Sequence, residues 1–123
     1  MATREKNKLT CRPRIRVVAG DQIALGPGKV DLLEAIDRWG SISKAARESG
    51  LSYRRAWTLV DTMNKSFKSA LVESSAGGKK GGGAHLTPLG EKLAATYRAM
   101  ESKAETAMKP DWKTIQRSLK PSE

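Results

Sequence analysis

Residues 40–67 read GSISKAARESGLSYRRAWTLVDTMNKSF, and this stretch decides the fold of the chain. Ser43 is placed to cap a short helix over residues 44–48, because serine oxygens accept hydrogen bonds from free amides at helix starts. Gly50 ends that helix, and Ser52 caps a second, longer one. Two helices joined by a three- or four-residue turn containing glycine form the helix-turn-helix pattern.

Apolar periodicity extends the helical prediction to both sides of the turn. The second helix runs to about Phe67, and a preceding helix over residues 29–39 ends at Gly40. Apolar residues recur at steps of three and four: Leu32, Leu33, Ile36 and Trp39 in the preceding helix, and Ala56, Leu59, Val60, Met63 and Phe67 in the second. Each helix therefore has one face for a core.

A long helix is predicted towards the C-terminal end. Thr87 and Pro88 mark its start, and the pair at residues 109–110 ends it after Met108. Its length exceeds what a small domain needs to cover its core, so its distal half is predicted to form a dimer seam; alternatively, it lies back on its own core. The seam residues are Leu93, Tyr97, Met100 and Ala104. Residues 109–123 form a tail or one short helix.

Short strand patterns precede the first helix. Residues 14–17 alternate polar and apolar side chains, the period of a half-buried strand. Gly20 and Asp21 suit a two-residue turn, and residues 22–25 form the return strand. Residues 12–25 are therefore predicted to be a β-hairpin.

A second strand pair follows the helix-turn-helix. Residues 70–73 and 84–86 read as strands, and the stretch AGGKKGGG between them, residues 76–83, is not expected to hold regular structure. Strand, basic loop and strand is the layout of a wing. The prediction is an α+β winged helix-turn-helix with an N-terminal β-hairpin and a long C-terminal dimerisation helix. Residues 12–108 form this domain, and residues 1–11 form a flexible basic N-terminus.

Composition indicates an anionic partner. The 123 residues include 23 Lys and Arg against 13 Asp and Glu, a net charge of +10, which favours nucleic acid. No apolar run is long enough for a membrane span or a secretory signal. The single cysteine, Cys11, excludes an internal disulfide. These features predict a cytoplasmic, nucleoid-associated protein.

The second helix of the motif carries the residues expected to contact DNA. In helix-turn-helix proteins the first residues of this helix face base edges in the major groove. Here they are Ser52, Tyr53, Arg54, Arg55 and Thr58. Arg54 and Arg55 also have a simpler interpretation as solvated residues. However, two cations at a helix start oppose its dipole unless an anion lies in front of them.

Other residues leave alternatives open. Trp57 either packs against the first helix of the motif or touches the groove edge. Asp61 either accepts a hydrogen bond from the side chain of Trp57 or Thr58, or pairs with Lys65 four residues on, and the ion pair is favoured. Lys79 and Lys80 are expected to approach DNA phosphates from the wing; the alternative is a disordered loop with incidental lysines.

Catalytic and metal-binding patterns are not found in the sequence. The glycine-rich stretch lacks the spacing of a phosphate-binding P-loop. His85 has no metal ligands at a suitable spacing, and Cys11 has no partner base. No catalytic residue, metal or cofactor is predicted, and the chain is not expected to be an enzyme.

Four stretches in order resemble the N-terminal DNA-binding domain of the ModE family of molybdate-responsive regulators, a winged helix related to that of LysR-type regulators. They are GSISKAARESGLSYRRAW (40–57), DTMN (61–64), LVE (71–73) and GGKKGGGAHLTPLG (77–90), within roughly Gly26 to Glu101. The resemblance implies a dimer and these DNA-facing positions: Ser43, Ser52, Arg54, Arg55, Trp57, Thr58, Lys79 and Lys80. Full-length members of that family add C-terminal molybdate-binding modules, which are built of β-strands. The residues after Glu101 show no strand pattern that would form such a module. The chain is thus expected to be a stand-alone DNA-binding member, with molybdate not a ligand.

The predicted function is that of a transcriptional regulator which binds a palindromic operator as a homodimer. Two alternatives remain open at this point. One is a protein–protein adaptor that keeps the winged-helix fold. The other is an oxyanion-responsive regulator that uses the basic hairpin residues Arg12, Arg14 and Arg16.

Overall fold

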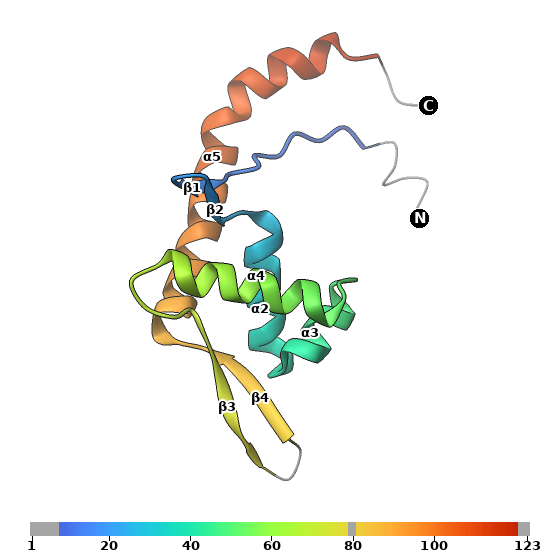
Figure 1. Ribbon diagram of the computed structural model, residues 1–123. Coiled ribbons are helices and arrows are strands. Elements are labelled where there is room, and N and C mark those ends of the chain that lie inside the picture. Colours follow the sequence, from blue (N-terminus) through green and yellow to red (C-terminus); the bar gives the residue numbers. More distant parts are fainter. Residues whose placement is uncertain (1–7, 79–80, 121–123) are drawn as a thin grey trace.

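The computed structural model describes residues 8–78 and 81–120. In chain order the elements are β1 (Val17–Ala19), β2 (Gln22–Leu25), α2 (Pro27–Trp39), α3 (Ile42–Glu48), α4 (Tyr53–Ser66), β3 (Val72–Gly78), β4 (Gly81–Leu86) and α5 (Pro88–Ser118). The strands form two antiparallel pairs, β1 with β2 and β3 with β4 (Figure 1). This arrangement confirms the α+β winged helix. No described helix is long and apolar enough to cross a bilayer.

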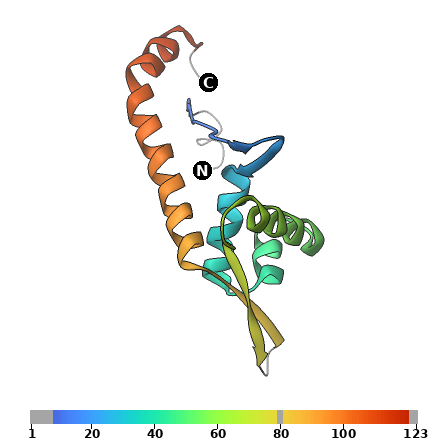
Figure 2. The same ribbon diagram turned by 60° about the vertical axis from the view of Figure 1, so that its left-hand side comes forward.

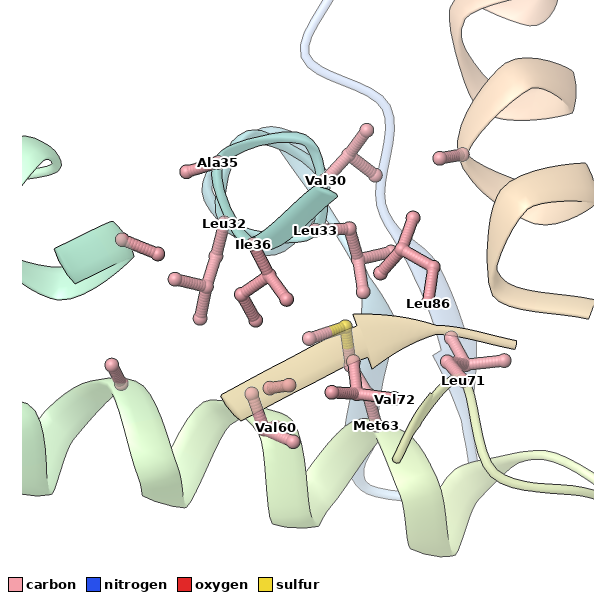
Figure 3. Close-up of a cluster of buried hydrophobic side chains, with 14 of the residues drawn as sticks. Val30, Leu32, Leu33, Ala35, Ile36, Val60, Met63, Leu71, Val72 and Leu86 are labelled. Atoms are coloured by element: carbon pink, nitrogen blue, oxygen red, sulfur yellow. The ribbon is translucent and has the colours of Figure 1, made fainter. Parts of the chain in front are cut away.

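The core is built around α2. Leu33 and Ile36 are fully buried and point from α2 towards Met63 of α4, which is also fully buried (Figure 3). Alanines at the crossing of α3 and α4, among them Ala45 and Ala56, are fully buried and let the two helices approach closely. Burial of each large apolar side chain stabilises the fold by about 1.5–3 kcal/mol. Trp39 was predicted on the same face but is 42% exposed, because it lies in the last turn of α2 beyond the crossing.

Side-chain caps define where the later helices begin. The Ser52 hydroxyl oxygen accepts a hydrogen bond from the Arg55 amide at 3.0 Å, which confirms the predicted start of α4. The predicted cap of α3 at Ser43 is wrong. Ser41 is the cap and accepts from the Lys44 amide at 3.1 Å. Since α2 already ends at Gly40, with φ +68°, Ser41 is the first residue in position to cap.

The N-terminal hairpin is shorter than predicted. Gly20, with φ +65°, makes the predicted turn, but β1 begins only at Val17, opposite Leu25. Residues 12–16 keep the alternating exposure of a strand without pairing. They have no partner because the chain leaves β2 at Leu25 and enters α2 at Pro27.

The wing, residues 72–86, is more regular than predicted. Its strands extend into the glycine-rich stretch as far as Gly78 and from Gly81 onwards, because buried Val72 and Leu86 fix the register at the base. Lys79 and Lys80 lie outside the described residues. Asn64 of α4 holds the base of the wing: its side-chain oxygen accepts from the Leu71 amide at 2.8 Å, and its side-chain nitrogen donates to the Val72 carbonyl at 3.0 Å.

The last helix is also longer than predicted. α5 continues through Pro110 to Ser118, so the predicted end at Met108 and a separate helix over residues 111–119 are wrong. A proline removes one backbone hydrogen bond and bends a helix, but the turns on either side of it can persist. Accordingly, α5 rises away from the domain and bends towards its C-terminal end (Figure 2).

Two contacts hold the first part of α5 to the domain. Tyr97 is 1% exposed, and its hydroxyl donates to the Ile15 carbonyl at 2.7 Å. The Arg98 guanidinium donates to the Glu34 and Asp31 carboxylates of α2 at 2.6–2.9 Å, and to Glu101 of α5 at 2.9 Å. These contacts tie α5 to both α2 and the segment that precedes β1.

Candidate nucleic-acid interface

The outer face of α4 is the centre of the candidate site. Ala56, Val60 and Met63 face the core and Leu59 packs partly against it, whereas Tyr53, Trp57 and Thr58 are exposed. Arg54 and Arg55 are exposed, and neither belongs to an ion pair within residues 8–78 and 81–120. The first turn of α4 contains no acidic residue. Two exposed guanidinium groups without carboxylate partners are therefore available to an anion at this helix start.

Trp57 and Asp61 are two residues for which the sequence left alternatives open. Trp57 is 51% exposed, so about half of its side chain is open to solvent on α4. Asp61 pairs with Lys65 at 2.9 Å, which confirms the predicted ion pair. The Thr58 hydroxyl donates to the Arg54 carbonyl at 2.9 Å, and its oxygen lone pairs remain able to accept.

A small cleft joins α4 to the wing. It has a volume of about 300 Å³ and brings Ser43 of α3 together with Tyr53 of α4, two of the predicted DNA-facing residues. Ser41 and Ser74 also line it. Neither was singled out in the sequence, since Ser74 reaches the site only through the pairing of β3 with β4. The cleft thus presents hydroxyl groups between the recognition helix and the wing.

The base of the wing approaches the end of α2 closely. The Ala84 amide donates to the Gly40 carbonyl at 3.0 Å. A Cβ added at Gly83 would lie 3.0 Å from that same carbonyl oxygen, so glycine permits this approach. The backbone contact fixes the base of the wing relative to α3 and α4.

The remaining chemistry-bearing residues lie elsewhere. His85 is on β4, where its ring contacts the Ser75 hydroxyl at 3.1 Å and the Glu73 carboxylate at 3.5 Å. Cys11 is exposed. In the parts of the chain that the structure describes, no three His, Cys, Asp or Glu side chains gather as they would around a metal ion.

The residues predicted for a dimer seam divide into two groups. Tyr97 is buried in its own chain and has no surface for a partner, so it is removed from the seam. Burial also raises the pKa of its hydroxyl. Leu93 packs in part against the same core. Met100 is 41% exposed and Ala104 is half-buried, so both retain surface that a second chain can cover.

Comparison with known proteins agrees with this geometry. The family described as "Bacterial regulatory helix-turn-helix protein, lysR family" matches residues 28–91, just over half of the chain. The molybdenum-pterin-binding protein MopB of Rhodobacter capsulatus is 55% identical over 78 residues, 63% of this chain and 29% of that protein. The molybdenum transport protein ModE of Azotobacter vinelandii is 46% identical over 85 residues, 69% and 32% of the two chains.

Two further proteins are similar over parts of their length. The DNA-binding transcriptional dual regulator ModE of Escherichia coli (strain K12) is 44% identical over 71 residues, 58% of this chain and 27% of that protein. The crystal structure of ArgP from Mycobacterium tuberculosis superposes with a TM-score of 0.48 at 21% identity, covering 68% of this chain and 30% of that one. The chain spans about a third of the length of the curated relatives that it matches. The resemblance to the ModE regulators is confirmed, and the chain belongs to the LysR family of bacterial regulatory helix-turn-helix proteins.

Proposed function

We propose that this protein is a sequence-specific, DNA-binding transcriptional regulator. The observation that carries the proposal is the outer face of α4 in a LysR-type helix-turn-helix. Arg54 and Arg55 are exposed at the start of this helix and have no carboxylate partner among the described residues. With α4 in the major groove, an arginine is the side chain best suited to pair with the O6 and N7 atoms of guanine. Trp57 and Thr58 lie beside these arginines on the same exposed face.

Phosphate contacts would orient the domain on the duplex. Ser43 and Tyr53 line the same small cleft between α4 and the wing, and Ser52 caps the start of α4. Hydroxyl groups at such positions bond phosphate oxygens and set the register without reading sequence. Lys79 and Lys80 lie between the two wing strands in the sequence, and we propose that their charges contact the phosphate backbone of the DNA.

The regulator is proposed to act as a homodimer on a palindromic operator. Exposed apolar side chains lie on the distal part of α5 and directly after it, Ile115 at 58% and Leu119 at 44%, and they suit a second copy of the chain. Two-fold symmetry of the protein implies inverted half-sites about one helical turn apart.

Molybdenum is not part of the proposal. The names of two relatives refer to molybdenum, but the similarity covers only about a third of each relative and corresponds here to the helix-turn-helix region. We therefore propose DNA binding for this chain and propose no effector molecule.

Selection of bound duplexes from a random library, at near-physiological salt, tests the proposal. The wild type is expected to enrich an inverted repeat, and Arg55→Ala to weaken binding to that repeat by about 1–3 kcal/mol while relaxing preference at one base pair. Lys113→Ala, on the exposed distal part of α5, removes the same charge and serves as the control. If the folded wild type enriches nothing and shifts no random duplex at low salt, the adaptor function is favoured instead.

A further inference from the structure

A second basic surface lies on the side of α4 opposite the wing. There a cleft of about 730 Å³, the hairpin cleft, opens between the N-terminal hairpin, the first turn of α2 and α4. Its walls include Arg14 and Arg16 from the segment before β1, Lys29 from α2 and Arg55 from α4. In both views α4 runs between the hairpin and the wing (Figure 1, Figure 2).

The charges that line the hairpin cleft do not balance. Against the four cations stand two carboxylates, Asp21 and Asp31. Asp31 is already engaged, since its oxygen accepts from the Arg98 guanidinium at 2.6 Å. Asp21 lies in the hairpin turn and makes no ion pair within the described ranges. The same ion pairs include none of the four cations.

Lys29 and Arg55 show the effect of the excess positive charge in the hairpin cleft. The Lys29 ammonium donates to the Ile23 carbonyl of β2, a neutral acceptor. Partial burial, and then the nearby charge of Arg55, lower the pKa of Lys29. The two side chains come from different elements and repel each other across the cleft. An anion between them would remove this repulsion.

The lining also indicates what kind of anion fits. The described lining contains no aromatic residue, and its apolar members Pro27, Ile23, Leu51 and Leu59 stand beside four cations, so an occupant of the cleft meets both apolar surface and positive charge. The cleft follows α4 from Arg55 to Thr62 and shares Arg55 and Thr58 with the proposed DNA-facing surface. An extended polyanion that lies against α4 would therefore run directly into it.

We propose that the hairpin cleft is a phosphate-binding site that receives the backbone of the bound duplex on the side of α4 opposite the wing. This inference rests on the proposed function. It places the hairpin arginines and Lys29 beside the duplex on the side of α4 opposite the wing. A free oxyanion has the same chemistry, and the experiment below separates the two sources.

The test measures duplex affinity against salt concentration for the full chain. The double variant Arg14→Gln/Arg16→Gln removes two exposed charges from the cleft. It is expected to lower the slope of log K against log salt by about 1–2, with equal losses on specific and random duplexes, because each neutralised phosphate contributes about 0.9 to that slope. The control Lys113→Gln/Arg117→Gln removes two charges from distal α5 and should keep the wild-type slope.

Lys29→Gln provides a second variant from a different wall of the cleft, with its folding checked by urea unfolding. It is expected to lower the slope by about 1. An unchanged slope in both cleft variants, with a wild type that binds duplex, would overturn the inference and leave the proposed function intact. A wild type that binds no duplex would overturn both.

Inorganic phosphate is the probe for a free anion. Thermal unfolding of the wild type in phosphate, compared with chloride at equal ionic strength, is expected to show no specific stabilisation. Stabilisation that is lost in Arg14→Gln/Arg16→Gln, together with an unchanged salt slope on DNA, would assign the cleft to a free oxyanion and overturn the duplex as its occupant.

Discussion

The proximal part of α5, residues 88–101, and its distal part, residues 102–118, belong to one helix but have opposite surroundings. The proximal part packs on α2 and β4 and buries Gly90, Ala94 and Tyr97. The distal part buries no residue, although Ala104, Met108, Trp112, Ile115 and Leu119 continue at three- and four-residue spacings towards the end of the helix. One apolar pattern thus continues from a packed region into an exposed one.

The difference shows why periodicity alone does not define a core. A helix that lacks tertiary contacts is only marginally stable in water, because most helical stability comes from packing of its apolar face. The proximal part has that packing within its own chain. The distal part buries no side chain fully within the described residues, so a second chain is the partner that we propose for it.

Tyr97→Ala is the change that should most affect the proximal part. Removal of this buried ring is expected to reduce the free energy of unfolding by about 3–5 kcal/mol, through lost contacts and the cavity left behind. Urea unfolding measures the loss. Tyr97→Phe keeps the ring and removes only the hydrogen bond to the Ile15 carbonyl, so it should cost about 1 kcal/mol. Similar losses in both variants would contradict the dominant role of the ring.

Ile115→Asp makes the corresponding change in the distal part. If the distal face forms the dimer, a charge placed there is expected to weaken dimerisation by about 3 kcal/mol, roughly 100-fold in Kd, without unfolding the domain. Sedimentation equilibrium gives Kd, and Thr106→Asp adds the same charge on the opposite side of the helix as a control. A wild type that stays monomeric at all concentrations, or an unchanged Kd, would count against the seam.

Local signals in the sequence predicted where α4 and α5 begin. Thr87 and Pro88 begin α5 as expected, because a cap involves only residues within one turn: the Thr87 hydroxyl oxygen accepts from the Gly90 amide at 3.0 Å. Arg54 and Arg55 were placed on α4 by the same kind of local reasoning from Ser52. Such features depend on neighbours in the chain, so one sequence is enough to find them.

Features that depend on distant segments were not predictable in this way. Tyr97 shares its periodicity with Met100, but its hydroxyl bonds Ile15, 82 residues away in the chain. A Cβ at Gly90 would lie 2.1 Å from the Leu71 carbonyl oxygen, and no feature of the sequence around Gly90 indicates this close approach. The hairpin cleft likewise exists only because the hairpin packs beside α4, so Arg16 and Arg55 become neighbours through tertiary structure alone.

Arg98→Gln tests the polar contribution to the proximal contact and should have the smallest effect. The Arg98 side chain is 34% exposed, so solvent screening weakens the stabilisation that its ion pairs provide. The expected loss in the free energy of unfolding at pH 7 is about 1 kcal/mol or less. Hydrogen bonding to Arg98 holds the pKa of the Glu34 carboxyl below its ordinary value. The ion pairs therefore stabilise the fold fully above the ordinary pKa of a glutamate, and this stabilisation is lost as the pH falls through the folded-state pKa.

Urea unfolding at pH 7 and pH 3 makes that pH dependence measurable. The difference in unfolding free energy between the wild type and Arg98→Gln is expected to be smaller at pH 3 than at pH 7, because the pH falls towards the lowered pKa of the Glu34 carboxyl. Lys103→Gln, which removes an exposed charge from the same helix, should be nearly neutral at both pH values. A difference that persists at pH 3 would mean that Arg98 acts through its packing, with its guanidinium 5.9 Å from the centre of the Tyr97 ring, rather than through charge.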